Sequence, residues 1–250
     1  MELPSYVALS YLTAQGRALE VHAANLANAG TSGFKTERVL FSDWLARQNM
    51  GPDAAGGAMA RSPVAFVQDR ATYRDQTPGA MTPTGNPLDL AITGDGFFTV
   101  ETPRGPRLTR AGRFSPQADG TIADHEGNAL LDTAGQKLRL SAADLTLTVG
   151  SDGSIRSENG RIGQVGVVAP QDTTRMQAEG STTFRADSAT AAVDQPRILQ
   201  GAVEESNVQP VLEMTQMMSG LRSFQFAAQF IEGEATRQQS AIDKITQRKG

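Results

Sequence analysis

The sequence predicts a mainly β central domain flanked by two long α-helices, one near each end of the chain. Apolar residues near both termini recur at steps of three and four, which is the period of an amphipathic helix. Between them, short apolar runs alternate with glycine-containing turn signals, which is typical of antiparallel β structure. The 250 residues suffice for one large domain or two modest ones.

The N-terminal helix is expected over residues 5–28. Asn28 and Gly30 tolerate the left-handed conformation that ends many helices, so they supply the expected stop. Residues 1–35 therefore form the first segment, an assembly helix followed by a junction. The apolar stripe of this helix has heptad spacing and consists of Leu9, Leu12, Gly16, Leu19, Ala23 and Leu26.

Residues 36–83 are expected to be an extended linker, because the stretch from Met50 to Pro83 is rich in Gly, Pro and Ala and has little periodicity. Residues 84–200 are expected to form one all-β domain. Runs such as LDLAI, GFFTV and SIRS are strand-like, and the glycines between the runs mark hairpin turns that require positive φ. Asp-Gly-Thr-Ile at 119–122 is echoed by Asp-Gly-Ser-Ile at 152–155, which indicates a repeated short hairpin.

Residues 201–250 carry the second helix, expected over 210–248. Its stripe keeps the heptad spacing for more than four heptads and needs a partner helix. Because intervening chain separates each stripe from the β domain, we expect the two helices to pair with each other and with neighbouring copies in a coiled-coil-like assembly. The stripe consists of Met214, Met217, Leu221, Phe224, Ala228, Ile231, Ala235, Gln238, Ile242 and Ile245.

The sequence contains no recognisable catalytic, cofactor or metal site. It has no cysteine, and its two histidines, His22 and His125, lack further ligands at close spacing. The acidic residues of the β region lie in turns and do not match a calcium-binding loop. Gly94-Asp95-Gly96 continues into a strand rather than a helix, so it is not a dinucleotide fingerprint.

Composition also restricts the partners. The formal net charge of −4 argues against nucleic-acid binding. No apolar run approaches the length that spans a membrane, so we expect no membrane insertion. The N-terminus has neither a basic region nor a continuous apolar run, and we therefore expect no cleaved signal peptide.

Three blocks resemble the bacterial flagellar rod and hook family, in that family's order. The first is the stretch HAANLANAGTSGFKTERVLF at 22–41, in which Ala24 stands where the family usually has its first Asn. The second runs from Thr84 to Asp132, and the third from Gly201 to Ile231. The junction motif of the first block consists of Asn25, Asn28, Thr31, Gly33, Phe34 and Lys35.

The resemblance implies a structural subunit of the flagellar basal-body rod with a rod/hook-type fold. Its helices would pair in the innermost tube of a helical assembly that transmits torque from motor to hook, and it would use no cofactor. The partners implied are copies of itself, other rod proteins and the flagellar export apparatus, and the location is the periplasmic rod. The assembly interface implied consists of Leu9, Leu12, Leu19, Leu26, Met214, Met217, Leu221, Phe224, Ile231 and Ile242.

Several alternatives remain open. Within the family, the opening MELPSYVALS and the C-terminal block resemble the proximal rod member adjacent to the distal rod, and a distal rod subunit is the alternative. Outside the family, the alternative is a monomeric protein-binding module whose helices pair within one molecule. An enzyme acting on peptidoglycan requires a carboxylate pair in a cleft, and the β region offers acids only in turns.

Overall fold

The computed structural model describes residues 3–46, 64–144 and 146–247, and these fold into two compact units. A helical unit comprises Met1–Leu26, Glu37–Tyr73 and Pro210–Gly250, and a β unit comprises Ala27–Thr36 and Arg74–Gln209. The boundaries differ from the expected ones at 35, 83 and 200. Residues 27–35, which the sequence assigns to the first segment, belong together with residue 36 to the β unit.

The helical unit contains two helices of unequal length. α1 spans Leu3–Ala27 with 25 residues, and α2 spans Pro210–Gln247 with 38 residues, close to the expected bounds. Among the described side chains of α1, the most buried are Ala14, Val21 and Asn25, at 6%, 4% and 1% exposure. They form a stripe different from the leucine stripe that the heptad pattern predicts. The hydrophobic pattern of the sequence did not reveal this stripe, because Ala14 is small and Asn25 is polar.

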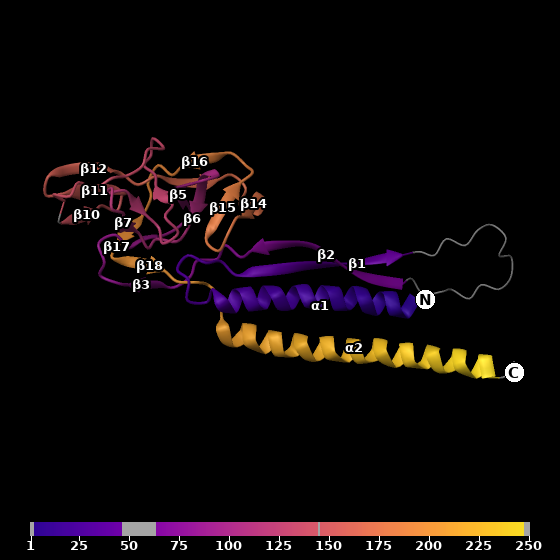
Figure 1. Ribbon diagram of the computed structural model, residues 1–250. Helices are drawn as coiled ribbons and strands as arrows, with labels where there is room; N and C mark the ends of the chain where they lie inside the picture. The colour runs from indigo at the N-terminus through magenta and orange to yellow at the C-terminus, as the bar shows by residue number, and fades with distance from the viewer. Residues whose placement is uncertain (1–2, 47–63, 145, 248–250) are drawn as a thin grey trace. The chain divides into compact units, whose positions relative to one another are not determined.

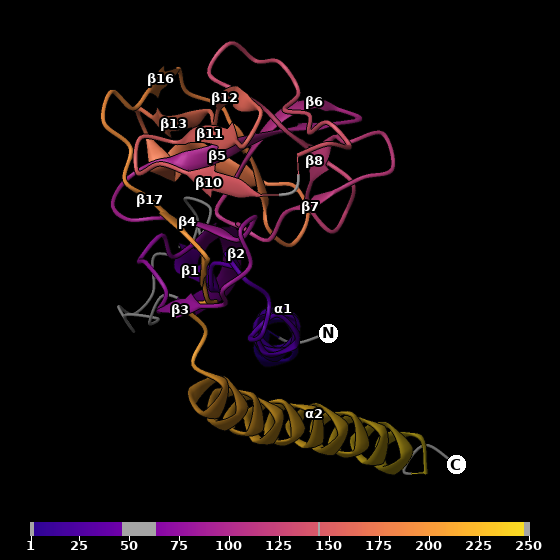
Figure 2. The same cartoon turned by 90° about the vertical axis from the view of Figure 1, so that its left-hand side faces the viewer.

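The segment expected as an extended linker contains paired strands. β1 (Glu37–Ala46) and β2 (Val64–Arg74) form a two-stranded sheet that lies beside α1, as Figures 1 and 2 show. Much of the Gly-, Pro- and Ala-rich stretch that suggested a linker falls in 47–63, outside the described residues. A third short strand, β3 (Met81–Pro83), pairs with β18 (Ala202–Glu204) of the β unit.

The β unit is built on one large, mainly antiparallel sheet of short strands. Its path is β14-β15-β6-β5-β9-β8-β7, and β13 joins it by pairing with both β5 and β16. These strands are β5 (Phe97–Thr102), β6 (Gly105–Thr109), β7 (Ser115–Pro116), β8 (Ile122–Ala123), β9 (Ala129–Leu130), β13 (Val167–Pro170), β14 (Met176–Ala178), β15 (Thr183–Ala186) and β16 (Thr190–Ala192).

Smaller sheets complete the unit. β10 (Leu147–Val149), β11 (Ser154–Ser157) and β12 (Gly160–Gln164) form a three-stranded antiparallel sheet. β4 (Leu90–Ile92) pairs with β17 (Ile198–Gln200), and a 3₁₀ turn at Thr173–Arg175 precedes β14. The expectation of a mainly β central region is confirmed for the described chain.

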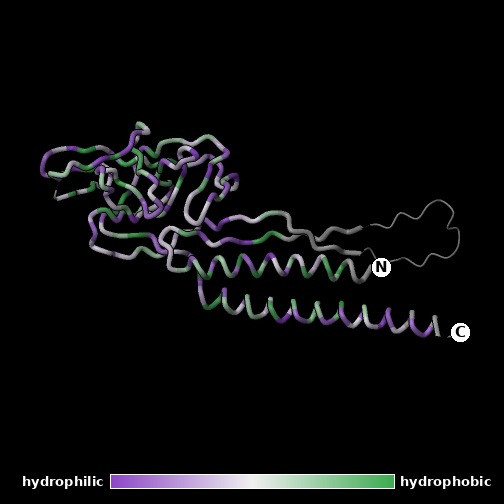
Figure 3. Tube along the Cα trace, viewed as in Figure 1, coloured by the Kyte–Doolittle hydropathy of each residue, from purple (hydrophilic) through white to green (hydrophobic). Residues whose placement is uncertain are grey.

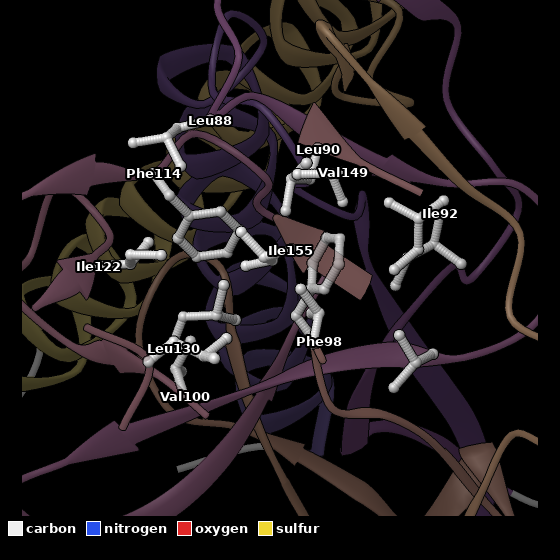
Figure 4. Close-up of a cluster of buried hydrophobic side chains, with 14 residues drawn as sticks. Leu88, Leu90, Ile92, Phe98, Val100, Phe114, Ile122, Leu130, Val149 and Ile155 are labelled. Carbon is white, nitrogen blue, oxygen red and sulfur yellow. The ribbon is translucent and has the colours of Figure 1, made fainter. Parts of the chain in front are cut away.

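One main hydrophobic cluster holds these sheets together, and Figure 4 shows its side chains converging from several strands. Phe98 and Phe114 meet edge to face, with ring centroids 5.5 Å apart. Ile122 and Ile155, the last residues of the two echoed tetrapeptides, are both fully buried in it. The repeat therefore places one isoleucine from each hairpin in the same core.

The turn signals formed as the sequence predicts. Gly120 and Gly153 have φ of 81° and 83°. In each turn the preceding aspartate, Asp119 or Asp152, accepts hydrogen bonds from the backbone and hydroxyl of the residue two positions on. These donors hold the pKa of both carboxyls below the usual value. These two turn aspartates therefore stabilise their own turns by accepting hydrogen bonds from them.

Among the described residues, no cluster of three or more His, Cys, Asp or Glu side chains is arranged to hold a metal ion. Neither of the two helices combines the length and hydrophobicity needed to cross a bilayer over its described residues.

Candidate functional site

The site to which the sequence drew attention is the junction, residues 25–37, which leads from α1 into β1. At its start, Asn25 is buried and its side-chain amide donates to the Glu37 carbonyl at 2.9 Å. The Glu37 N–H donates back to the Asn25 side-chain oxygen at 2.8 Å. One side chain thus acts as a hydrogen-bonding edge for the backbone twelve positions later, and it closes the junction into a loop.

The chain leaves α1 by a series of tight turns. The Thr31 N–H donates to the Asn28 carbonyl at 3.1 Å, and the Thr31 hydroxyl donates to the Asn28 side-chain oxygen at 3.3 Å. The expectation that Asn28 and Gly30 end the helix in the left-handed conformation is wrong. No non-glycine residue of the described chain has positive φ, and Gly30 does not have it either.

Gly33 is the junction glycine that needs its conformational freedom. Its φ is 73°, which L-residues rarely adopt. A Cβ at this position would also collide with the backbone of Arg110 and Ala111. Its N–H donates to the Glu204 carbonyl at 2.8 Å, so the junction backbone lies directly against β18 and the segment after β6.

Phe34 and Lys35, at the end of the motif, are each only 1% exposed. The Arg74 guanidinium lies 4.8 Å from the centre of the Phe34 ring and 5.6 Å from that of Phe184. Arg74 also donates to the carbonyls of Gly180 and Ser181. The aromatic residue of the motif is therefore fixed through an arginine to the β14–β15 hairpin.

Lys35 belongs to an ion cluster of three buried side chains, Lys35, Glu204 and Arg110. The Lys35 ammonium lies 2.5 Å from Glu204 Oε1, and the Arg110 guanidinium lies 3.3 Å from Oε2. Glu204 is fully buried and also accepts from the Gly79 N–H at 3.0 Å. Each cation has carbonyl partners as well, which are Thr77 for Lys35 and Ile92 and Gly94 for Arg110.

The cluster is costly to bury and strongly dependent on its one anion. Burial lowers the pKa of Lys35, while the hydrogen bond and charge of Glu204 oppose that shift. Burial likewise lowers the pKa of Arg110, again against the attraction of Glu204. Two cations share one carboxylate, so removing that carboxylate leaves both charges unpaired in the interior.

Asn207, which follows β18 in the chain, forms hydrogen bonds with the end of the junction at Thr36. Its side-chain oxygen accepts from both the N–H and the hydroxyl of Thr36, each at 2.7 Å. Its amide donates to the carbonyls of Asp75 and Thr77 at 2.9 and 3.0 Å. Three segments far apart in sequence, around 36, 76 and 207, are thereby held by one side chain.

The predicted assembly residues lie on both helices of the helical unit. On α1, Leu9 is 56% exposed, whereas Leu12, Leu19 and Leu26 are half-buried. Leu19 lies over Gly220 of α2, where a Cβ would meet its methyl group at 3.1 Å. On α2, Met214, Leu221 and Phe224 are exposed, Met217 and Ile231 are half-buried, and the side chain of Ile242 lies outside the described part.

His22, for which the sequence predicts only a packing or exposed role, lies at the contact between the helices. Its Nδ1 is 2.6 Å from Oε2 of Glu213, a residue that is 5% exposed in the first turn of α2. The other histidine, His125, lies in an exposed turn beside Glu126. His22 and Glu213 therefore fix the start of α2 against α1.

Sequence reasoning missed Arg74, Arg110, Glu204 and Asn207 as partners of the junction. No sequence signal paired them, because Lys35, Arg110 and Glu204 stand in three different blocks and other charged residues lie near Arg110 and Glu204. The polar groups of the cluster bind the chain's own backbone and side chains. We name this arrangement the joint, in which the junction is bonded to Arg74, Arg110, Glu204 and Asn207.

Three family models match the chain, each over one of these regions. A model described as flagella basal body rod protein matches residues 6–35. One described as the flagellar hook protein FlgE/F/G D1 domain matches 91–179, and one described as the flagellar basal body rod FlgEFG protein C-terminal matches 199–244. Lys35, Arg110 and Glu204 thus fall in three separate matched regions.

Relatives match over nearly the whole chain. The flagellar basal-body rod protein FlgF of Caulobacter vibrioides is 35% identical over 98% of both chains. FlgF of Mesorhizobium japonicum is 34% identical over 96% of both. The flagellar basal-body rod protein FlgG of Bacillus subtilis is 31% identical over 85% of this chain and 88% of its own.

The ion cluster predicts a large effect of one substitution. Glu204→Gln keeps the shape of the side chain but leaves the charges of Lys35 and Arg110 unpaired. We expect the free energy of unfolding of the β unit to fall by about 3–5 kcal/mol, measured by urea denaturation. Glu205→Gln, one position on and only half-buried, is the control and should unfold close to the unsubstituted protein. Equal midpoints for the two variants would contradict the assignment.

The junction glycines offer a second comparison. Gly33→Ala forces a Cβ into the backbone of Ala111 at positive φ, and we expect a loss of at least about 2 kcal/mol of stability. Gly30→Ala, where a Cβ would meet nothing within 4 Å, should change stability by less than about 0.5 kcal/mol. Thermal unfolding of both variants measures the difference, and a Gly33→Ala protein as stable as Gly30→Ala would refute the close approach.

Proposed function

The chain belongs to the family of flagellar basal-body rod proteins, and we propose that it builds the rod by pairing its terminal helices with those of neighbouring subunits. It is a structural subunit of the basal body and not an enzyme. The single observation that supports helix-mediated assembly is the concentration of exposed large hydrophobic side chains on α2, most of them between Val211 and Phe230.

The division into two units supports the same mechanism. The β unit has its own core and includes residues 27–36 of the junction, so it does not need the helices to bury its apolar residues. The helices bury one stripe of α1 and leave much of α2 uncovered. Apolar surface of this extent on a monomer marks an interaction site. A coiled-coil-like pairing through the predicted stripes would cover it, with copies of the chain and other rod proteins as partners.

The position in the rod is part of the proposal. Relatives named FlgF are 35%, 34% and 32% identical to the chain, and those named FlgG are 31%, 30% and 29% identical. We propose the proximal rod position adjacent to the distal rod, as the opening MELPSYVALS and the C-terminal block indicate, with a distal rod subunit as the alternative. We also propose that the subunit reaches the periplasmic rod through the flagellar export apparatus without a cleaved signal peptide, and that the finished tube transmits torque.

Charged substitutions in the predicted stripes test the assembly. Leu19→Asp or Phe224→Asp should abolish incorporation into basal bodies and swarming, because each places a charge in an apolar helix contact. The unfolding transition of the β unit in the purified full-length variants should not change. Thr13→Asp, at an exposed polar position of α1, is the control and should assemble.

A Leu19→Asp or Phe224→Asp strain with normal basal bodies would show that the stripe is not the assembly contact. The monomeric binding module, the competing function, predicts that the purified monomer keeps both helices protected and that no basal body contains the chain.

A further inference from the structure

Residues 198–207, which we name the closing segment, lie near the C-terminal end of the β unit. They contain β17, the strand paired with β4, and β18, the strand paired with β3. In the described chain, β3 and β4 pair with no other strand. Two strands from the first part of the unit therefore have no strand partner until the closing segment is in place.

The closing segment also contributes side chains to the interior of the β unit. Ile198 belongs to the main hydrophobic cluster, and Ala202 and Val203 are 2% and 0% exposed. Figure 3 shows hydrophobic stretches alternating with hydrophilic ones along the chain of this unit. Because these stretches are covered by packing against one another, a unit without its closing segment leaves part of the cluster in contact with water.

The buried charges depend on the closing segment more strongly than the apolar residues do. Among the described residues, Glu204 is the only carboxylate in an ion pair with Lys35 or with Arg110. It follows Lys35 by 169 positions and Arg110 by 94. Burying a cation without its counterion is costly. The interior around Lys35 and Arg110 can therefore close only when Glu204 is present.

The closing segment is bonded directly to the first segment of the unit. The Gly33 N–H donates to the Glu204 carbonyl, and the Thr36 N–H donates to the Asn207 side chain. Nearly the whole β unit lies between these partners in sequence. Closing a long loop costs chain entropy before its contacts form, so contacts between such distant segments form late in folding.

We propose that docking of the closing segment is the step that completes the β unit, and that the main sheet is not stably formed before it. A chain that leaves the flagellar export apparatus N-terminus first then stays open until residue 207 has emerged. This consequence rests on the proposed export of the chain, whereas the order of folding does not. The arrangement prevents the β unit from folding in parts while its C-terminal residues are still inside the channel.

Thiol labelling during refolding tests this order, because the chain has no cysteine and an introduced thiol is its only one. Val100→Cys reports on β5 of the main sheet and Val203→Cys on the closing segment, and both positions are fully buried. Each purified full-length variant is diluted out of urea and pulsed with a maleimide at increasing times. We expect the two thiols to become protected with rate constants that agree within about twofold, as in a single cooperative step.

A second measurement adds Glu204→Gln to the Val100→Cys chain. We expect protection of the thiol to become at least about tenfold slower, because the sheet then has to close around two unpaired cations. Glu205→Gln in the same chain is the matched control and should refold at the unsubstituted rate. If the Glu204→Gln chain stays unfolded, the order of the two thiols in chains with the native Glu204 decides.

Protection of Val100→Cys at least about tenfold sooner than Val203→Cys would overturn the proposal, because the main sheet would then form without the closing segment. An unchanged refolding rate of the Glu204→Gln chain would overturn it as well. Both measurements are made on the purified chain, so either failure would leave the proposed function in the rod intact.

Discussion

One buried carboxylate, that of Glu204, is the interaction on which the arrangement of the β unit's chain segments depends. It binds Lys35 of the junction, Arg110 after β6 and the backbone of Gly79. A buried ion cluster adds little net stability compared with apolar side chains of the same size, because desolvation offsets most of the attraction. We interpret the cluster as a device for specificity, since only one register of the three segments pairs all of its charges.

The rest of the joint is consistent with this role. Asn25 bonds the backbone of Glu37, and Asn207 bonds both the backbone and the hydroxyl of Thr36, so they define where Glu37 and Thr36 lie. Gly33 permits a contact between backbones that any other residue would prevent. The chain passes between its two units at 26–27, 36–37, 73–74 and 209–210. The joint in the β unit lies next to three of these crossings in sequence.

Local signals made part of this structure predictable. The helices at both ends were predictable from the period of their apolar residues. The turns were predictable from glycines, and those at 94, 96, 120, 127, 135, 153 and 160 do have positive φ. The junction was recognisable because Asn, Gly and Thr crowd together after a helix. The ion cluster was not recognisable in the sequence. Lys35 and Arg110 are 75 residues apart, Arg110 and Glu204 are 94 residues apart, and the three side chains meet only in the folded chain. The buried stripe of α1 was hidden because Ala14 and Asn25 are not strongly apolar.

The central claim is that residues 27–36 of the junction fold as part of the β unit and not with the helix that precedes them. Amide hydrogen exchange on the purified full-length monomer tests this most directly, because the Gly33 and Thr36 amides are bonded to Glu204 and Asn207. The account predicts that both exchange as slowly as the buried amides of β5 and β6. Exchange of these two amides at the rate of the exposed helix α2 would contradict it.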